Sequence, residues 1–126
     1  MSHFRLQHNY ERTSEESIFT KIIKRELPAT IIYEDDKALV IKDLYPQAPV
    51  HLLAIPKKQI GSISEMSDED IELMGYMMKV IRDVAKQENL EMGYRVVSNN
   101  GIHACQAVYH VHFHILAGKQ LSGQVN

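Results

Sequence analysis

The sequence predicts an α+β fold in which a mostly antiparallel, five-stranded sheet packs with one short and one long helix. Two observations support this prediction. Apolar residues recur at helical spacing in two stretches, and strand-like runs bounded by Pro, Gly, Asn or Asp account for five more segments. Their order along the chain is helix, three strands, helix and two strands, which is typical of a single α+β domain.

The first half of the chain is expected to form the short helix and three strands. Residues 14–17 supply possible helix caps and early acidic side chains, an apolar face follows at 18–23, and Pro28 ends the run. Strands are predicted at 29–34, 38–43 and 50–55, separated by a polar turn at 34–37 and a proline-containing loop at 45–49.

The second half should contain the long helix and the last two strands. Ser67 and Asp70 resemble a capping box, and the apolar residues behind them keep a helical register over 67–89. Strands are predicted at 93–99 and 108–117, with a turn at Asn100-Gly101 between them. Residues 1–13 are predicted to form a flexible N-terminal arm, and residues 14–126 a single domain.

Composition narrows the classes of protein that the chain can belong to. A length of 126 residues suits one packed core, and 44% hydrophobic with 24% charged residues argues against disorder. The net charge of −2 does not indicate binding to nucleic acid or to a membrane surface. The single cysteine excludes an intrachain disulfide, and no apolar stretch resembles a signal peptide or a membrane span. A cytoplasmic protein is therefore predicted.

The most informative segment of the sequence is the last predicted strand. Side chains alternate between the faces of a strand, so His110, His112 and His114 should share one face. The opposite face is apolar and can pack on the long helix; it comprises Tyr109, Val111, Phe113 and Ile115.

Three interpretations of the histidine row compete. The histidines are a solvated face, or they bind zinc with His51 or His103 as a further ligand, or they carry out nucleophilic catalysis. Neutral imidazole attacks phosphorus well, and a strand carbonyl can hold its Nδ1–H so that Nε2 is available. Three histidines in alternate positions disfavour the first interpretation. Spacing alone does not separate the other two.

The pattern His-φ-His-φ-His-φ-φ, here His110 to Leu116, resembles the signature of the histidine triad (HIT) nucleotide-binding superfamily. The resemblance is to the Hint branch and covers roughly Ser17 to Lys119. Further similar segments occur in the same order: 18–23, 28–29, 33–36, 46–51, 55–58, 93–95, 97–99 and 106–109.

This resemblance implies a HIT-like fold and a hydrolase that cleaves P–N bonds of purine nucleoside phosphoramidates, with no metal or cofactor. His112 would attack the α-phosphorus to form a nucleotidyl-histidine, and water would then release AMP or GMP. The remaining histidines would contact phosphate oxygens or assist proton movement; these are His110, His114 and His51. Relatives also imply a homodimer whose sheet continues across the interface.

The resemblance also implies a set of nucleotide-binding residues. Asp43 would hold the ribose hydroxyls, since a carboxylate can accept from two vicinal hydroxyl groups. The base would lie against apolar side chains, and the phosphate near an amide and a loop. These positions are Phe19, Ile22 and Leu44 for the base, and Asn99, Cys105, Gln106 and Ala107 for the phosphate side.

Two positions depart from the Hint pattern. Cys105 and Ala107 occupy positions where Hint proteins carry glycine and serine. Alanine has no hydroxyl to contact the phosphate or leaving group, which affects the expected rate and leaving-group preference. Cys105 is either an added reactive thiol or a small packed residue. The alternatives to a phosphoramidase are a nucleotide-binding regulatory protein with little turnover, a metallohydrolase and a dinucleoside polyphosphate hydrolase.

Overall fold

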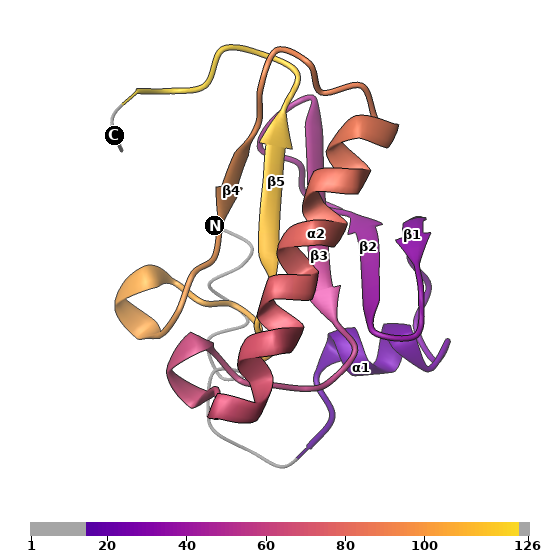
Figure 1. Ribbon diagram of the computed structural model, residues 1–126, viewed down its shortest axis with the longest axis vertical. Coiled ribbons are helices and arrows are strands. Elements are labelled where there is room, and N and C mark those ends of the chain that lie inside the picture. The colour runs from indigo at the N-terminus through magenta and orange to yellow at the C-terminus, as the bar shows by residue number, and fades with distance from the viewer. Residues whose placement is uncertain (1–14, 124–126) are drawn as a thin grey trace.

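A computed structural model describes residues 15–123 of the chain. It contains one five-stranded antiparallel sheet with the strand order β1-β2-β3-β5-β4, which confirms the predicted fold class (Figure 1). The elements are α1 (Ile18–Ile23), β1 (Ile31–Glu34), β2 (Ala38–Lys42), β3 (Val50–Pro56), α2 (Ile71–Gln87), β4 (Arg95–Val97) and β5 (Phe113–Ala117). The predicted arm at 1–13 lies outside the described residues.

Alternation along the strands divides the core into two layers. Even-numbered residues of β2 and β3, such as Val40 and Ala54, pack with α2 on one face of the sheet. Odd-numbered residues, such as Leu39 and Leu53, pack with α1 and Phe19 on the other face. Figure 1 shows the long helix α2 lying across the sheet, with the short helix α1 near one end. His51 of β3 is odd-numbered and therefore lies on the α1 face. On β5 it is Phe113 and Ile115 that pack with α2, so His114 between them lies on the α1 face as well.

The helix starts agree with the predicted caps. Ser17 is the N-cap of α1, and its hydroxyl accepts from the Thr20 backbone N–H. Ser67 and Asp70 form the predicted capping box, but the first turn is a 3₁₀ segment (Asp68–Asp70) and α2 itself begins at Ile71. No helix within residues 15–123 has the length and apolar character needed to cross a bilayer.

The last strand is shorter than predicted, because β5 begins at Phe113 and residues 108–112 are irregular. The ladder with β3 ends where Ala54 pairs with Phe113, and Pro56 beyond it has no N–H to continue the ladder. The Val111 N–H instead donates to the Ile60 carbonyl at 2.6 Å. His110 and His112 therefore lie before the strand, and only His114 is part of it.

Candidate active site

A cavity of about 480 Å³ opens on the α1 face of the sheet, beside the histidine segment. Its walls combine apolar side chains from α1 and β3 with polar groups from the chain segments that follow β2 and β4. The structure brings ten of the twelve predicted site residues to this cavity: Phe19, Ile22, Asp43, Leu44, His51, Asn99, Cys105, Ala107, His112 and His114.

Two predicted site residues, Gln106 and His110, do not line the cavity. The Gln106 side chain is buried and holds the loop together, because Nε2 donates to the Gly61 and Val108 carbonyls. Its Oε1 accepts from the Gly101 N–H. This amide thus shapes the wall of the site without facing it.

His112 has a fixed ring orientation that suits a nucleophile. Its Nδ1 lies 2.7 Å from the His110 carbonyl oxygen, which can only accept, so Nδ1 carries the proton. Nε2 then holds a lone pair, and no group within residues 15–123 hydrogen-bonds to it. The side chain is only 6% exposed, and burial lowers the pKa of His112 from its usual range, which keeps the ring neutral.

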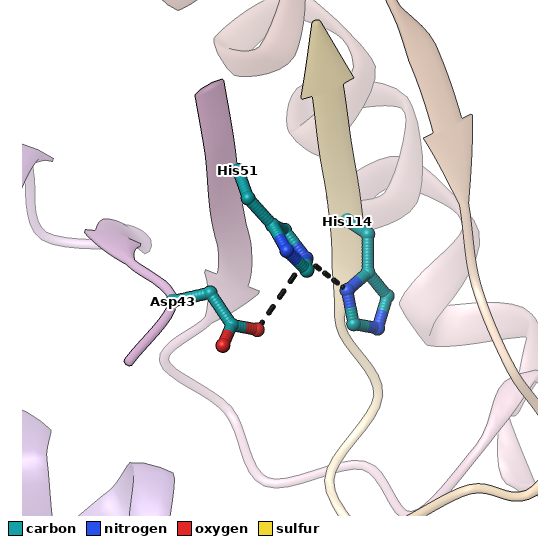
Figure 2. A group of neighbouring side chains, drawn as sticks. All are labelled: Asp43, His51 and His114. Atoms are coloured by element: carbon teal, nitrogen blue, oxygen red, sulfur yellow. Dashed lines mark hydrogen bonds and ion pairs between the residues drawn. The ribbon is translucent and has the colours of Figure 1, made fainter. Parts of the chain in front are cut away.

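His51 and His114 form a second pair, on neighbouring strands β3 and β5. The Gln47 backbone N–H donates to His51 Nδ1 at 2.9 Å, so neutral His51 carries its proton on Nε2. That Nε2 lies 2.8 Å from His114 Nδ1 and 3.4 Å from Asp43 Oδ2 (Figure 2). His114 Nδ1 is then the acceptor, and neutral His114 carries its proton on Nε2.

Electrostatics around His51 also favour the neutral ring. Burial lowers the pKa of His51, while the nearby Asp43 carboxylate acts in the opposite direction. Asp43 is held in place because Oδ1 accepts from the Tyr45 N–H at 2.7 Å. Because the Gln47 N–H donates to His51 Nδ1 and His51 Nε2 then donates to His114 Nδ1, the Gln47 backbone sets the tautomers of both rings. Sequence cannot reveal this role, because almost any residue offers a backbone N–H.

The apolar wall of the cavity comes from α1. Phe19 is buried, and its ring meets His112 edge to face at a centroid distance of 5.0 Å. The resemblance places Phe19 in the base site and periodicity places it in the core; in the structure it packs in the core and also lines the cavity. Leu44 also lines the cavity, and 80% of its surface is exposed.

The site also contains a group of side chains that could hold a metal ion. Ligand atoms of Asp43, His51 and His114 all lie within 4.8 Å of one another, whereas His103 is exposed on a separate turn and does not join them. A metal on His51 Nε2 would require a proton on Nδ1, where the Gln47 N–H already points. The hydrogen bonds present therefore fit a metal ion poorly.

Comparison with known proteins now identifies the family. A family model described as scavenger mRNA decapping enzyme C-term binding matches residues 16–125. The chain is 41% identical to a HIT family hydrolase from Clostridium thermocellum, with a TM-score of 0.85 over 90% of this chain and all of that one. The chain belongs to the HIT family. It thus shares its fold and its general hydrolase character with this family of nucleotide-binding proteins.

Two sequence relatives carry more specific names. The chain is 50% identical over 108 residues to a 14 kDa zinc-binding protein of Zea mays, covering 84% of each chain. It is 44% identical over 108 residues to adenylylsulfatase HINT1 of Arabidopsis thaliana, covering 84% of this chain and 74% of that protein. These two relatives are thus named for different properties, one for zinc binding and the other for hydrolysis of adenylylsulfate.

Proposed function

We propose that the chain hydrolyses purine nucleoside phosphoramidates through a nucleotidyl-histidine intermediate. The observation that supports this most directly is the hydrogen bond from His112 Nδ1 to the His110 carbonyl, which leaves the Nε2 lone pair for attack. Nε2 would form a bond to the α-phosphorus while the P–N bond breaks, and the leaving amine would take up a proton from solvent water. Water would then attack the phosphorus, release the nucleoside monophosphate and restore neutral His112.

The remaining cavity residues have roles consistent with this reaction. In the proposal, Asp43 Oδ2 accepts from a ribose hydroxyl, and the base lies against Phe19 and Ile22 from α1. His114, with its proton on Nε2, donates to a phosphoryl oxygen and stabilises the charge that develops there. His51 fixes that tautomer, because its Nε2–H donates to His114 Nδ1. The enzyme acts in the cytoplasm, where purine nucleotides are abundant.

The direct test is release of AMP from adenosine 5′-phosphoramidate by the purified protein, with and without EDTA. Because His51 is a poor metal ligand in this hydrogen-bonding arrangement, we expect the same rate in both conditions. AMP binding without release of product would instead indicate a nucleotide-binding regulatory protein. Loss of activity in EDTA, restored by Zn²⁺, would support a metallohydrolase and contradict the proposal.

A second substrate class is favoured by Ala107, which lines the cavity and has no proton to donate. An amine leaving group needs a proton, whereas sulfate leaves as a stable anion. We therefore also propose adenylylsulfate as a substrate, as the name of the Arabidopsis relative suggests.

Ala107→Ser is expected to separate the two substrates. A hydroxyl at this position should raise kcat/KM for adenosine 5′-phosphoramidate by about tenfold or more, because it can assist protonation of the amine. The value for adenylylsulfate should change by less than about threefold, and this substrate is the internal control. Equal effects on both substrates would mean that position 107 does not act on the leaving group.

We also propose that the chain forms a homodimer through the edge strand β4. Val96 is 40% exposed in the middle of this strand, and Tyr94 and Met92 expose further apolar surface beside it. An exposed apolar edge strand is a favourable place for a second sheet to continue. Light scattering of the wild type should give twice the chain mass of 14.5 kDa, and the Val96→Glu variant should give the mass of a single chain. A monomeric wild type would contradict this interface.

A further inference from the structure

His110 is fully buried, and both of its ring nitrogens are hydrogen-bonded to groups outside the cavity. Nε2 lies 2.8 Å from the Pro56 carbonyl oxygen, which can only accept, so Nε2 carries the proton. Nδ1 is then an acceptor, and it lies 2.6 Å from the hydroxyl oxygen of Ser17. His110 thus needs one donor at Nδ1, and Ser17 is in position to supply it.

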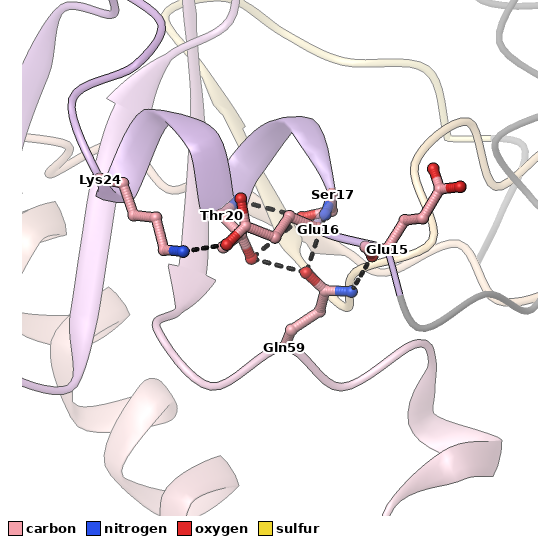
Figure 3. Close-up of polar contacts among 6 residues, drawn as sticks. All are labelled: Glu15, Glu16, Ser17, Thr20, Lys24 and Gln59. Atoms are coloured by element: carbon pink, nitrogen blue, oxygen red, sulfur yellow. Dashed lines mark hydrogen bonds and ion pairs between the residues drawn. The ribbon is translucent and has the colours of Figure 1, made fainter.

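The Ser17 hydroxyl has one proton, and its surroundings determine where that proton points. Its oxygen already accepts from the Thr20 backbone N–H at 3.0 Å, as the N-cap of α1. The Thr20 hydroxyl oxygen is 3.4 Å away, while Thr20 donates its own proton to Gln59 Oε1 at 2.7 Å (Figure 3). His110 Nδ1 is the nearer acceptor. Ser17 therefore caps α1 and donates to His110 at the same time.

Gln59 holds Ser17 in this position from the chain segment after β3. Its Oε1 accepts from the Ser17 backbone N–H at 2.8 Å, and its Nε2 donates to the Glu15 carbonyl at 2.9 Å (Figure 3). Glu16 and Lys24 form an ion pair on the exposed side of the same helix. The start of α1 is thus fixed at several backbone and side-chain atoms.

The same contacts connect α1 to the proposed nucleophile. The His110 carbonyl accepts from His112 Nδ1, and the ring contacts of His110 with Ser17 and Pro56 restrain the backbone that carries this carbonyl. Phe19, two residues after Ser17, contacts the rings of both His110 and His112 at centroid distances of 5.8 and 5.0 Å. One short segment therefore holds the apolar wall and the attacking imidazole in a fixed relation.

We propose that Ser17 is a positioning residue: its hydroxyl donates to His110 Nδ1, holds the Nε2–H tautomer together with the Pro56 carbonyl, and so anchors the residue whose carbonyl orients His112. The catalytic part of this inference rests on the proposed function. The tautomer of His110 is a property of the protein without substrate, so the two can be tested separately.

The first experiment is ¹⁵N NMR of the histidine rings in the wild-type protein at neutral pH. We expect a protonated Nε2 and an unprotonated, hydrogen-bonded Nδ1 for His110, assigned by comparison with Ser17→Thr, which keeps the hydroxyl. A proton on Nδ1 of His110 in the wild type would overturn the proposal, whatever the activity of the protein.

The second experiment separates the hydroxyl donor from the helix cap. Ser17→Asp keeps a good cap for the Thr20 N–H but cannot donate to His110, whereas Ser17→Thr can do both and Ser17→Ala neither. We expect kcat/KM for adenosine 5′-phosphoramidate to fall by about tenfold or more in the Asp and Ala variants and to stay within about threefold in the Thr variant. The thermal midpoint of each variant shows whether it is folded at the assay temperature.

Rescue of activity by Ser17→Asp would show that capping alone matters and would overturn the positioning role. A wild type that releases no AMP would contradict the proposed function. The NMR measurement would still show whether His110 is the Nε2–H tautomer with a hydrogen-bonded Nδ1, as the contact with Ser17 requires.

Discussion

A protein with alanine in place of His112 is expected to lose AMP release by on the order of 10³-fold or more while still binding AMP. The reason is geometric. His112 offers the only cavity-lining imidazole within residues 15–123 whose Nδ1–H is held by a backbone carbonyl, and its Nε2 has no protein partner there. Removal of this ring removes the attacking atom.

AMP affinity should change by less than about tenfold, roughly 1.4 kcal/mol, because most of the cavity wall comes from other residues. Kinetics with adenosine 5′-phosphoramidate and AMP titration by calorimetry measure the two quantities. His103→Ala is the matched control, since His103 is exposed and lies outside the cavity. Substantial turnover by the His112 variant would assign the attack to another group.

Two histidines of the site could be placed on one face of the sheet because they lie on strands with clear alternation. His51 and His114 are far apart in sequence, but β3 and β5 are neighbours, and Leu53 pairs with His114 in the ladder. The resemblance to the HIT family supplied this pairing, whereas periodicity alone offered only the separate strands. The metal and nucleophile interpretations were inseparable by spacing, and the backbone contact of Gln47 with His51 is a structural observation that disfavours a metal on His51.

The prediction for residues 108–112 was wrong because strand alternation was extended past the last ladder partner. Val111 still packs against α2, together with Phe113 and Ile115, as expected. Tyr109 instead covers Gly61 so closely that a Cβ atom at this glycine would collide with the tyrosine ring. This close approach, and the loss of the ladder at Pro56, depend on a distant segment that local sequence patterns do not contain.

His110 shows the other limit of sequence reasoning. The family pattern puts it among the groups that contact phosphate oxygens, but its side chain is completely buried and its nitrogens bind Ser17 and Pro56. The sequence marks Ser17 only as a possible helix cap, because capping is a local property. Its contact with a residue 93 positions later is visible only in the folded chain.

Burial of His110 has a large expected effect on stability in mild acid. Burial lowers its pKa from 6.5 to about 4, while the hydrogen bond to Pro56 opposes the shift and neighbouring His112 adds to it. Between these values the unfolded chain binds a proton that the native protein does not bind. The free energy of unfolding should therefore fall as the pH falls, by about 3 kcal/mol from pH 6.5 to pH 4.

Chemical denaturation of wild type and His110→Gln across this range tests the assignment. Glutamine has a donor and an acceptor for Pro56 and Ser17 but does not titrate, so the pH slope should decrease by up to about 1.4 kcal/mol per pH unit. The pKa values of His112 and His51 are lowered by burial too, so a smaller slope of the same sign should remain. An unchanged slope in His110→Gln would mean that native His110 binds its proton as readily as the unfolded chain does, which the Ser17 and Pro56 contacts argue against.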